Sequence, residues 1–329
     1  MKTTRWGIIG CGHVTEVKSG PGFQNARNSS LVAVMRRNPA MARDYAERHA
    51  VPRWYDDAAR LIGDPEVDAI YVATPPASHE EYTRLAAQAG KPVYVEKPMA
   101  RNFEECQRMI AACHEKNVRL FVAYYRRALP RFLKIKELIG NGAIGVVRFA
   151  TVTLYCAPDP AEHDPQKLPW RVIPGIAGAG RFLDLGSHTL DILDFILGPI
   201  ASVSGQAANQ AGLYPAEDIV SGSFVFQSGV PATGMWCFTA FNTKWSDVNE
   251  IVGSQGKLRF STFGNEPVQL HRVSGSEDFA IDNPLHIQQP LIQTIVDELN
   301  GIGRCPSDGD SAARTSWVMD EMLRKWRGQ

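Results

Sequence analysis

The first 125 residues alternate short apolar runs with amphipathic helical segments, and this alternation limits the fold more than any other feature of the sequence. Short apolar runs bounded by turn residues are typical of strands that are buried on both faces of a sheet. The helical segments begin at the N-cap residues Asn38, Ser78 and Asn102, and Gly90 ends the second of them. Because strands and helices alternate, the sequence predicts a parallel sheet with helices on both faces. The predicted strands are 6–9, 31–35, 69–73, 92–95 and 120–123, and the predicted helices are 40–49, 79–89 and 103–116.

The pattern changes after Pro130. An irregular, proline-rich stretch from 156 to 180 separates the next strand from the next helix, and between 201 and 272 strands follow one another with no helix between them. Successive strands favour an antiparallel sheet. We therefore expect an α/β chain with two domains, 1–125 and 126–329. The remaining predicted helices are 132–139, 184–197, 288–300 and 308–325, and the clearest strands are 146–154, 219–226, 231–239 and 257–261.

Composition excludes several classes of protein. Lys plus Arg and Asp plus Glu each number 35, so the formal charge is zero and nothing indicates the clustered basic surface that nucleic acids require. No apolar run reaches the roughly 18–20 residues of a membrane span, and the apolar start at 6–9 is too short for a secretory signal. We therefore expect a cytoplasmic protein that binds neither nucleic acid nor a membrane.

The six cysteines are scattered along the chain. They form no Cys-x-x-Cys pair, and no histidine stands near them at the spacing of a zinc site. Cys106 and Cys113 are seven residues apart and fall on one stripe of a predicted helix. These features predict core thiols in a reducing compartment and no bound metal.

A glycine-rich turn follows the first predicted strand. Gly10 and Gly12, with His13 and Val14 after them, open a helix, an arrangement that lets the backbone approach a pyrophosphate at a helix N-terminus. Thr15 stands where the third small residue of the usual pattern is expected. At its position in the first strand–helix turn, the motif favours dinucleotide binding over a plain tight turn. Residues 19–22, Ser-Gly-Pro-Gly, are expected to break this first helix after two turns.

Two arginines, Arg36 and Arg37, follow the second predicted strand. An acidic residue about 20 positions after the glycines usually binds the ribose 2′-hydroxyl of NAD. Two guanidinium groups at that place instead suit a 2′-phosphate, which they bind through paired, charge-assisted hydrogen bonds. The pair therefore favours NADP over NAD, although two solvated arginines at a strand end would look the same in the sequence.

Several further motifs stand together in a fixed order. They are Gly10-Cys11-Gly12, Ala73-Thr74-Pro75-Pro76 with His79, Glu96-Lys97-Pro98, Trp170-Arg171 and Asp184-Leu185-Gly186-Ser187-His188. With them the chain resembles the Gfo/Idh/MocA family of oxidoreductases, by motifs over about residues 5 to 200 and more loosely beyond. The Glu-Lys-Pro and Asp-x-x-x-His elements in this order are the specific part of the resemblance.

The resemblance implies a Rossmann domain followed by an α+β domain with a large, mostly antiparallel open sheet. It implies an enzyme that transfers a hydride between NAD(P) and a carbinol or carbonyl carbon of a sugar, cyclitol or related polyol. It also implies a homodimer or homotetramer that assembles through the open face of the second-domain sheet. The alternatives are a non-catalytic NAD(P)-binding regulator of the same fold and a dehydrogenase of a non-sugar diol such as a dihydrodiol.

The predicted catalytic residues are Lys97, Asp184 and His188. Lys97 follows a predicted strand, so we expect it at the carboxyl edge of the sheet, where ligands bind in doubly wound folds. The resemblance also supports a cis bond between Lys97 and Pro98. Asp184 and His188 are four residues apart, so on a helix they share a face. An N-cap acid and a buried core histidine would give the same pattern. His188 is the expected general acid/base, because imidazole titrates near neutral pH. Lys97 is the alternative carrier of the proton.

The other candidates belong to the cofactor and to the substrate. Thr74, Pro75 and Glu96 lie at the same predicted edge of the sheet, and His79 is either a solvent-facing residue of a first helical turn or a neighbour of the cofactor. By resemblance, Trp170 and Arg171 line the nicotinamide or substrate side; a structural Trp–Arg stack is the alternative. The substrate candidates are Tyr125, Arg126, Tyr155, His163 and His286, and the alternative for Arg126 is that it only seals the junction between the domains.

Overall fold

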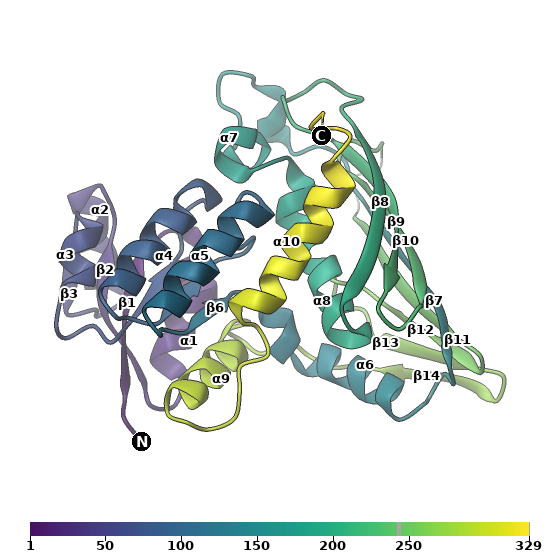
Figure 1. Cartoon of the computed structure of the whole chain (residues 1–329), viewed down its shortest axis with the longest axis horizontal. Coiled ribbons are helices and arrows are strands. Elements are labelled where there is room, and N and C mark those ends of the chain that lie inside the picture. The colour runs from purple at the N-terminus through teal and green to yellow at the C-terminus, as the bar shows by residue number, and fades with distance from the viewer. Residues whose placement is uncertain (242–244, 329) are drawn as a thin grey trace. The chain divides into compact units, whose positions relative to one another are not determined.

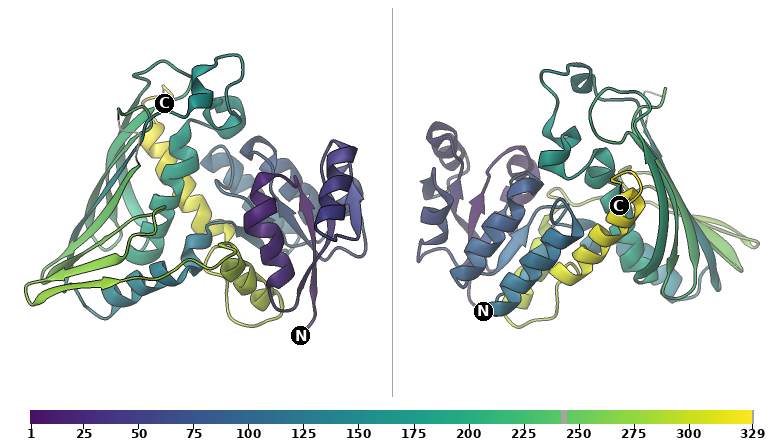
Figure 2. Two further views of the ribbon diagram at one scale, coloured as in Figure 1. Left: turned by 180° about the vertical axis from the view of Figure 1, so that it is seen from behind. Right: turned by 45° about the horizontal axis from the view of Figure 1, so that its top comes forward.

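The computed structural model describes residues 1–241 and 245–328, and the chain divides into two units. Unit 1 consists of Met1–Leu129 and Pro284–Ala313, and unit 2 of Pro130–Asn283 and Arg314–Gln329. Residues 284–313 therefore join the first unit, whereas the sequence division at 125/126 assigned them to the second domain. The cause is the packing of α9 (Gln289–Leu299) on α1 (Gly20–Asn25), side by side in Figures 1 and 2. The helices approach so closely that a Cβ atom at Gly22 would lie 2.8 Å from Cδ1 of Ile292.

Unit 1 is a doubly wound parallel sheet of six strands in the order β3-β2-β1-β4-β5-β6. The carboxyl ends of all six strands meet at one edge, which we call the carboxyl edge, and this is where such folds bind ligands. The strands are β1 (Thr4–Ile9), β2 (Ser29–Met35), β3 (Arg53–Tyr55), β4 (Ala69–Val72), β5 (Val93–Val95) and β6 (Leu120–Val122). The helices are α1, α2 (Pro39–Arg48), α3 (Ala58–Ile62), α4 (His79–Gln88), α5 (Phe103–Glu115), α9 and the start of α10 (Gly309–Leu323).

Side chains alternate between the two faces of this sheet, as the pleat requires. One face packs an aliphatic core that includes Ile9, Val72 and Val95. The other face carries an aromatic cluster in which the rings of Tyr71 and Tyr94 stack with centroids 4.8 Å apart. These two tyrosines place hydroxyl groups beneath the carboxyl edge.

The sequence analysis missed β3 and α3, because β3 has only three residues and one partner strand, β2. The first helix also differs from the prediction. Residues 19–22 do not break it, because a π-helical turn over Thr15–Ser19 leads directly into α1. The carbonyl of Thr15 accepts hydrogen bonds from the backbone N–H of Gly20 and from the hydroxyl of Tyr45, the latter at 2.9 Å. This wider turn accommodates Pro21, which has no N–H to donate.

The predicted helix ends are confirmed at Asn38, Asn102 and Gly90. Asn38 and Asn102 each accept a backbone N–H with the side chain, and Gly90 has a φ of 71°. Ser78 stands at the predicted N-cap position of α4, but the predicted capping hydrogen bond of its side chain is wrong. Its hydroxyl donates to the hydroxyl of Thr74 at 2.8 Å and makes no cap bond to α4.

Unit 2 is built on an eight-stranded sheet in the order β14-β13-β12-β11-β7-β10-β9-β8. The sheet is antiparallel except for the parallel pair β7 and β10, so the mostly antiparallel sheet predicted by resemblance is confirmed. The strands are β7 (Val147–Tyr155), β8 (Ile200–Ala208), β9 (Ile219–Phe226), β10 (Pro231–Cys237), β11 (Ser246–Gly253), β12 (Gly256–Phe260), β13 (Val268–Arg272) and β14 (Gly275–Phe279). The helices are α6 (Pro130–Gly140), α7 (Pro174–Ala177), α8 (Ser187–Leu197) and the end of α10.

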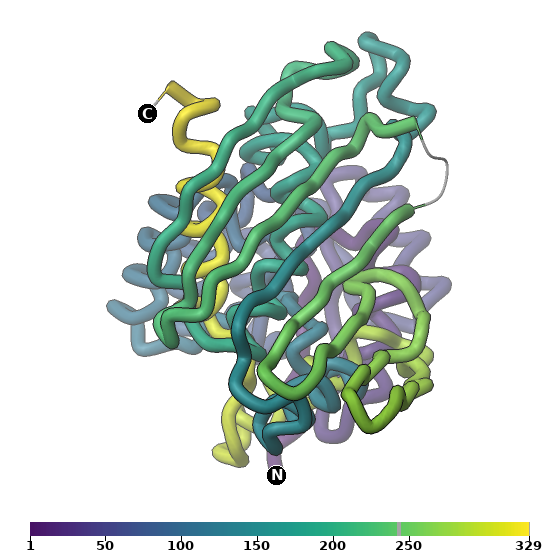
Figure 3. Tube along the Cα trace, turned by 90° about the vertical axis from the view of Figure 1, so that its right-hand side faces the viewer, coloured from purple at the N-terminus to yellow at the C-terminus, as the bar shows by residue number. Residues whose placement is uncertain are grey.

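Helices cover one face of the large sheet, and Figure 3 looks onto the other face, which none of the described helices of unit 2 covers. On the covered face, α10 packs closely against β8. A Cβ atom at Gly205 of β8 would lie within 2.6 Å of the Met322 backbone in α10. Among the described residues, no helix has both the length and the apolar character to cross a membrane. All six cysteines are free thiols.

Candidate functional site

The glycine turn lies at the carboxyl end of the central strand β1. Gly10 has a φ of 92°, and its N–H and that of Cys11 both donate to the Met35 carbonyl at the end of β2. A Cβ atom at Gly10 would lie 2.7 Å from the Thr74 methyl group, so only glycine fits between the two loops. A Cβ atom at Gly12 would meet nothing closer than 3.8 Å. The backbone at Gly12 is therefore open on one side, as a bound pyrophosphate requires.

Thr15 occupies the position of the third small residue in the motif, and its side chain bonds to the backbone of the turn. Its hydroxyl donates to the Gly12 carbonyl at 2.7 Å and accepts from the Gly12 N–H at 3.0 Å. These bonds close the turn before the π-helical segment begins. His13 is exposed and Val14 is half-buried beside this turn. The residues present thus fit a dinucleotide, although Thr15 departs from the usual pattern.

Arg36 and Arg37 follow β2 at the same edge, as predicted. The Arg36 guanidinium reaches the Cys11 carbonyl at 3.4 Å, which places a positive charge directly beside the glycine turn. Arg37 is exposed. Both arginines stand where the ribose of a dinucleotide is expected in this type of domain.

Glu96 and Lys97 follow β5, and a buried network fixes them. Oε1 of Glu96 accepts hydrogen bonds from the Tyr71 hydroxyl at 2.5 Å and from Nε2 of Gln288 at 2.7 Å, and Oε2 accepts from the backbone N–H of Lys97 at 3.1 Å. Gln288 in turn accepts from the Tyr94 hydroxyl at 3.1 Å. Burial raises the pKa of both tyrosines well above the ordinary value, so both remain hydroxyl donors. The backbone of the half-buried Lys97 is therefore held in place by the Glu96 network, and a cis bond joins Lys97 to Pro98.

His79 is fully buried, so the solvent-facing alternative that we considered for it is wrong. Its Nε2 lies 2.7 Å from the Thr74 carbonyl and its Nδ1 lies 3.1 Å from the Met99 carbonyl. Burial lowers its pKa below the ordinary value. His79 thus joins the loop after β4 to the loop after β5. Thr74 is half-buried and Pro75 is exposed at the surface of the first of these loops.

Tyr125 and Arg126 lie in a 3₁₀ turn (Tyr125–Ala128) just after β6. Both are buried, and the Arg126 guanidinium lies 5.0 Å from the centre of the Tyr125 ring. Arg127 donates to the Pro306 carbonyl at 3.1 Å. That contact ties this turn to the later segment of unit 1.

In unit 2, Asp184 lies in a second π-helical turn (Phe182–Gly186) that leads into α8. The sequence predicted a single regular helix over 184–197; the structure begins it two residues earlier and in the wider form. π-turns of this kind occur frequently at functional sites. His188 follows in the first turn of α8, is buried, and meets the ring of Phe263 edge-on at 5.6 Å.

Arg171 pairs directly with Asp184. Its Nε lies 3.1 Å from Oδ2 of Asp184, and its guanidinium stacks on the Trp170 ring at 4.5 Å. Asp184 is only 13% exposed, whereas Arg171 is 46% exposed. The Trp–Arg stack therefore exists, and its arginine contacts a predicted catalytic carboxylate.

Two buried carboxylates hold the loops around this π-turn. Glu162 is fully buried and forms an ion pair with Arg181, the residue just before the turn. Glu217 accepts the Gly180 N–H with both carboxylate oxygens, at 2.9 and 3.0 Å. Burial raises the pKa of Glu217 to about 7. The segment leading to Asp184 is thus fixed from both sides.

The remaining substrate candidates belong to both units. Tyr155 ends β7 and lines a hollow of about 560 Å³ with Trp245 and Arg259. His163 is exposed in a neighbouring loop of unit 2. His286 belongs to unit 1, ahead of α9, where its Nδ1 is buried and has no hydrogen-bond partner among the described residues. No described group of three or more His, Cys, Asp or Glu side chains has the arrangement of a metal site.

Sequence reasoning missed Gln288, Tyr71 and Phe263. Gln288 is almost 200 positions from Glu96, and nothing in its own neighbourhood signals the contact. Tyr71 lies in an apolar run that predicts only a strand. Phe263 could have been suspected as part of a Thr-Phe-Gly-Asn turn that follows a strand, but its approach to His188 depends on the register of the large sheet.

A doubly wound domain with a glycine turn after its first strand, together with a second domain on a large open sheet, defines a two-domain dinucleotide-binding oxidoreductase. Comparison with known proteins agrees. Residues 4–124 match the family described as "Oxidoreductase family, NAD-binding Rossmann fold", and residues 132–259 match the "GFO/IDH/MocA C-terminal domain". The chain belongs to the Gfo/Idh/MocA family, is an oxidoreductase, and binds a nicotinamide cofactor. The predicted family and fold class are confirmed.

Relatives span nearly the whole chain. It is 38% identical over 315 residues to Oxidoreductase P35 of Formosa agariphila, covering 96% of this chain and 97% of that protein. It is 29% identical over 313 residues to 1,5-anhydro-D-fructose reductase of Ensifer adhaerens, covering 93% of this chain and 91% of that protein. A solved structure of levoglucosan dehydrogenase with NADH and levoglucosan has a TM-score of 0.85 at 22% identity and covers 99% of this chain and 97% of its own. That likeness supports the fold.

Proposed function

We propose that the protein is an NADP-dependent oxidoreductase that transfers a hydride between the cofactor and a carbinol or carbonyl carbon of a sugar, cyclitol or related polyol. The observation that carries the proposal is the fixed Glu96–Lys97 segment at the carboxyl edge of a sheet whose glycine turn fits a dinucleotide. The likeness to 1,5-anhydro-D-fructose reductase over almost the full length supports a sugar-like substrate.

The preference for NADP rests on Arg36 and Arg37. Arg36 lies against the glycine turn and Arg37 is exposed beside it, so two guanidinium groups are available for a 2′-phosphate. The pyrophosphate is assigned to the Gly10–Gly12 turn with His13 and Val14. Thr74, Pro75 and Glu96 complete the cofactor side, and His79 acts only by joining their loops.

When bound, the nicotinamide supplies or accepts the hydride. We assign proton transfer at the substrate oxygen to His188, because an imidazole can give and take a proton near neutral pH. Lys97 donates a hydrogen bond to the same oxygen and stabilises the charge that develops on it. Asp184 orients His188 or binds a neighbouring hydroxyl. Arg171, stacked on Trp170, holds the Asp184 carboxylate in place.

The test is a titration with NADPH and NADH followed by nicotinamide fluorescence, and then a screen of sugars and cyclitols with the preferred cofactor. We expect tighter binding of NADPH and turnover of at least one cyclic polyol or ketose. Tighter binding of NADH would contradict the role of the arginine pair. Good cofactor affinity without turnover of any polyol would favour a non-catalytic regulator.

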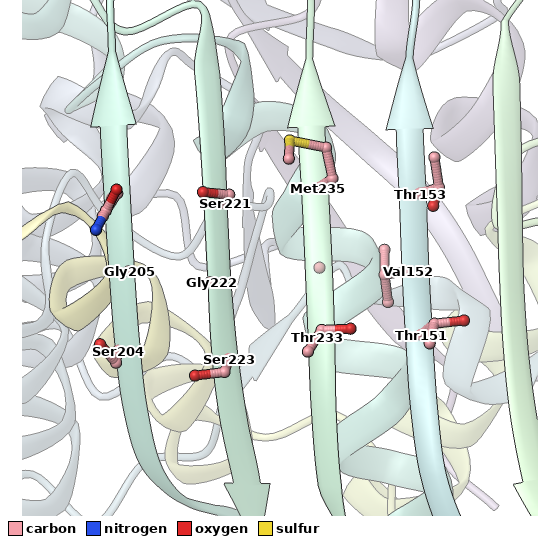
Figure 4. Close-up of a pocket in the computed structure, with 12 residues that line it drawn as sticks. Thr151, Val152, Thr153, Ser204, Gly205, Ser221, Gly222, Ser223, Thr233 and Met235 are labelled. Carbon is pink, nitrogen blue, oxygen red and sulfur yellow. The ribbon is translucent and has the colours of Figure 1, made fainter.

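We also propose a homodimer or homotetramer, assembled in the cytoplasm through the uncovered face of the large sheet. That face carries the exposed side chains of Phe149 and Met235 and a shallow hollow of about 650 Å³ between β7, β10, β9 and β8. Figure 4 shows its lining of Thr151, Thr153, Ser221, Ser223, Thr233 and Met235. Small hydroxyl side chains and one exposed methionine suit a flat contact with a second copy. Sedimentation should give more than one chain per particle, and a monomer would contradict this assembly.

A further inference from the structure

Three aromatic rings of unit 2 lie in a row that begins at His188. The His188 ring meets Phe263 at a centroid distance of 5.6 Å and an angle of 85°. Phe263 meets Trp245 at 5.6 Å and 72°. The buried imidazole is thereby connected, ring by ring, to an indole that is 48% exposed. The residues come from α8, from the loop after β12 and from the position just before β11.

The loop that carries Phe263 is held firmly. The buried Arg131 of α6 donates to the backbone carbonyls of Gly264 and Glu266, the latter at 2.9 Å. The Phe263 N–H donates to the Asp247 carboxylate at 2.6 Å. The hydroxyl of the preceding residue, Thr262, lies 3.1 Å from that of Thr189, next to His188 in α8. The position of the Phe263 ring beside His188 is thus determined by polar contacts on both sides of the loop.

The outer end of the row borders open space. Trp245 lines the hollow of about 560 Å³ together with Tyr155, Asp247, Arg259, Glu266 and Gln269. Aromatic surface next to hydrogen-bonding side chains is typical of sites for small polar ligands. A sugar ring presents such a mixture, because its hydroxyl groups lie around the edge while ring C–H groups form an apolar face that packs on aromatic rings.

We propose that Phe263 and Trp245, whose rings stand at 72° to each other, form an aromatic wall that binds the non-reacting part of the substrate and selects substrates in ring form. This inference rests on the proposed function, because His188 defines where the reacting carbinol lies. A cyclic sugar can place one carbinol at His188 while its C–H face packs on one of the two rings and its edge meets the other. An open-chain polyol has no such face, so it gains less from the two rings.

The experiment compares 1,5-anhydro-D-glucitol with D-glucitol, its open-chain counterpart, as ligands of the NADPH-loaded protein. Saturation-transfer NMR and calorimetry report binding without turnover. We expect Phe263→Ala and Trp245→Ala to weaken binding of the cyclic compound about 10-fold, in line with the worth of an aromatic contact plus its buried area. Binding of D-glucitol and of NADPH should change less than about twofold by the same reasoning. Phe263→Leu keeps most of the volume but loses the aromatic ring. It should therefore weaken binding of the cyclic compound more than binding of D-glucitol, as Phe263→Ala does.

The matched control is Trp326→Ala, because Trp326 is also in unit 2 and is 41% exposed. It should leave both affinities unchanged. Equal weakening of the two ligands by the wall variants, no weakening, or a changed oligomeric state in Trp245→Ala would overturn the proposal. So would the absence of saturation transfer to 1,5-anhydro-D-glucitol in the wild-type protein. The wall variants could weaken binding of the cyclic ligand selectively while the wild-type protein turns over no polyol. In that case the proposed role of the wall is retained and the proposed activity is rejected.

Discussion

Both the residue type and the position of His188 support the proposed role in proton transfer. His188 is buried at the start of α8, its ring contacts Phe263, and its neighbour Thr189 is bonded to Thr262. His79 is equally buried, but both its ring nitrogens face backbone carbonyls. We propose the chemical role for His188, and His79 contacts the carbonyls of two loops.

Replacement of His188 by alanine should lower kcat by at least about 100-fold, the usual worth of a general acid or base. The affinity for NADPH should stay near that of the wild-type protein, because the groups assigned to the cofactor belong to unit 1. Steady-state kinetics and a nicotinamide fluorescence titration measure the two quantities. Near-normal turnover in this variant would refute the assignment.

Individual residues were predictable where a local pattern defines their task. The glycine turn and the caps at Asn38 and Asn102 are of this kind, since each makes contacts within a few positions. The ion pair of Arg171 with Asp184 was not predicted, although both residues were singled out, because their separation of 13 positions gives no geometric rule. The burial of His79 was missed for the same reason: its partners are carbonyls of two different loops.

At the scale of elements, two π-helical turns stand at the two places where chemistry was predicted. One follows the glycine turn, and the other contains Asp184. Periodicity predicts a helix at both places, but it does not distinguish an i→i+5 turn from an i→i+4 turn. The parallel sheet, by contrast, follows from the alternation of strands and helices, and all six strands of unit 1 are parallel.

The contact between α9 and the strand β5 is the element-scale feature with the clearest energetic consequence. Gln288→Leu removes the amide that donates to Glu96 and accepts from Tyr94. It leaves buried polar groups without these partners, so we expect a loss of about 1–3 kcal/mol in the free energy of unfolding. Urea denaturation measures it.

Gln289→Leu is the matched control for that experiment. Gln289 is half-buried, and its amide donates a long hydrogen bond of 3.4 Å to the Asn25 carbonyl. This control should lose much less stability than Gln288→Leu. Equal losses in the two variants would show that the Glu96 network contributes little.

At the scale of the whole molecule, the division into two units was the least predictable feature. The first change from alternating to successive strands is visible in the sequence. The return of residues 284–313 to unit 1 is not, because it depends on the contacts of α9 with α1 and of Gln288 with Glu96. A chain that crosses between units more than once cannot be divided by composition along its length.

The pH dependence of the free energy of unfolding should include a contribution from Glu217. Its carboxyl has a pKa of about 7 in the folded protein, against 4.5 ordinarily, because burial disfavours the charge. The folded state therefore binds this proton more tightly, so the contribution favours folding below about pH 4.5 and is lost as the pH rises to about 7. The free energy of unfolding of Glu217→Gln relative to wild type should rise over this range by up to about 3 kcal/mol. Chemical denaturation at a series of pH values measures it, and parallel pH curves for the two proteins would contradict the buried ionisation.

Lys97 and His188 are proposed to act on the same substrate oxygen, and a double-mutant cycle on kcat/KM tests this proposal. Groups that act as a unit give losses that do not multiply. The account predicts that the loss in Lys97→Ala/His188→Ala is smaller, by about 10-fold or more, than the product of the losses in the two single variants. If the two losses multiply while NADPH binding stays normal, the residues act independently and the account is contradicted.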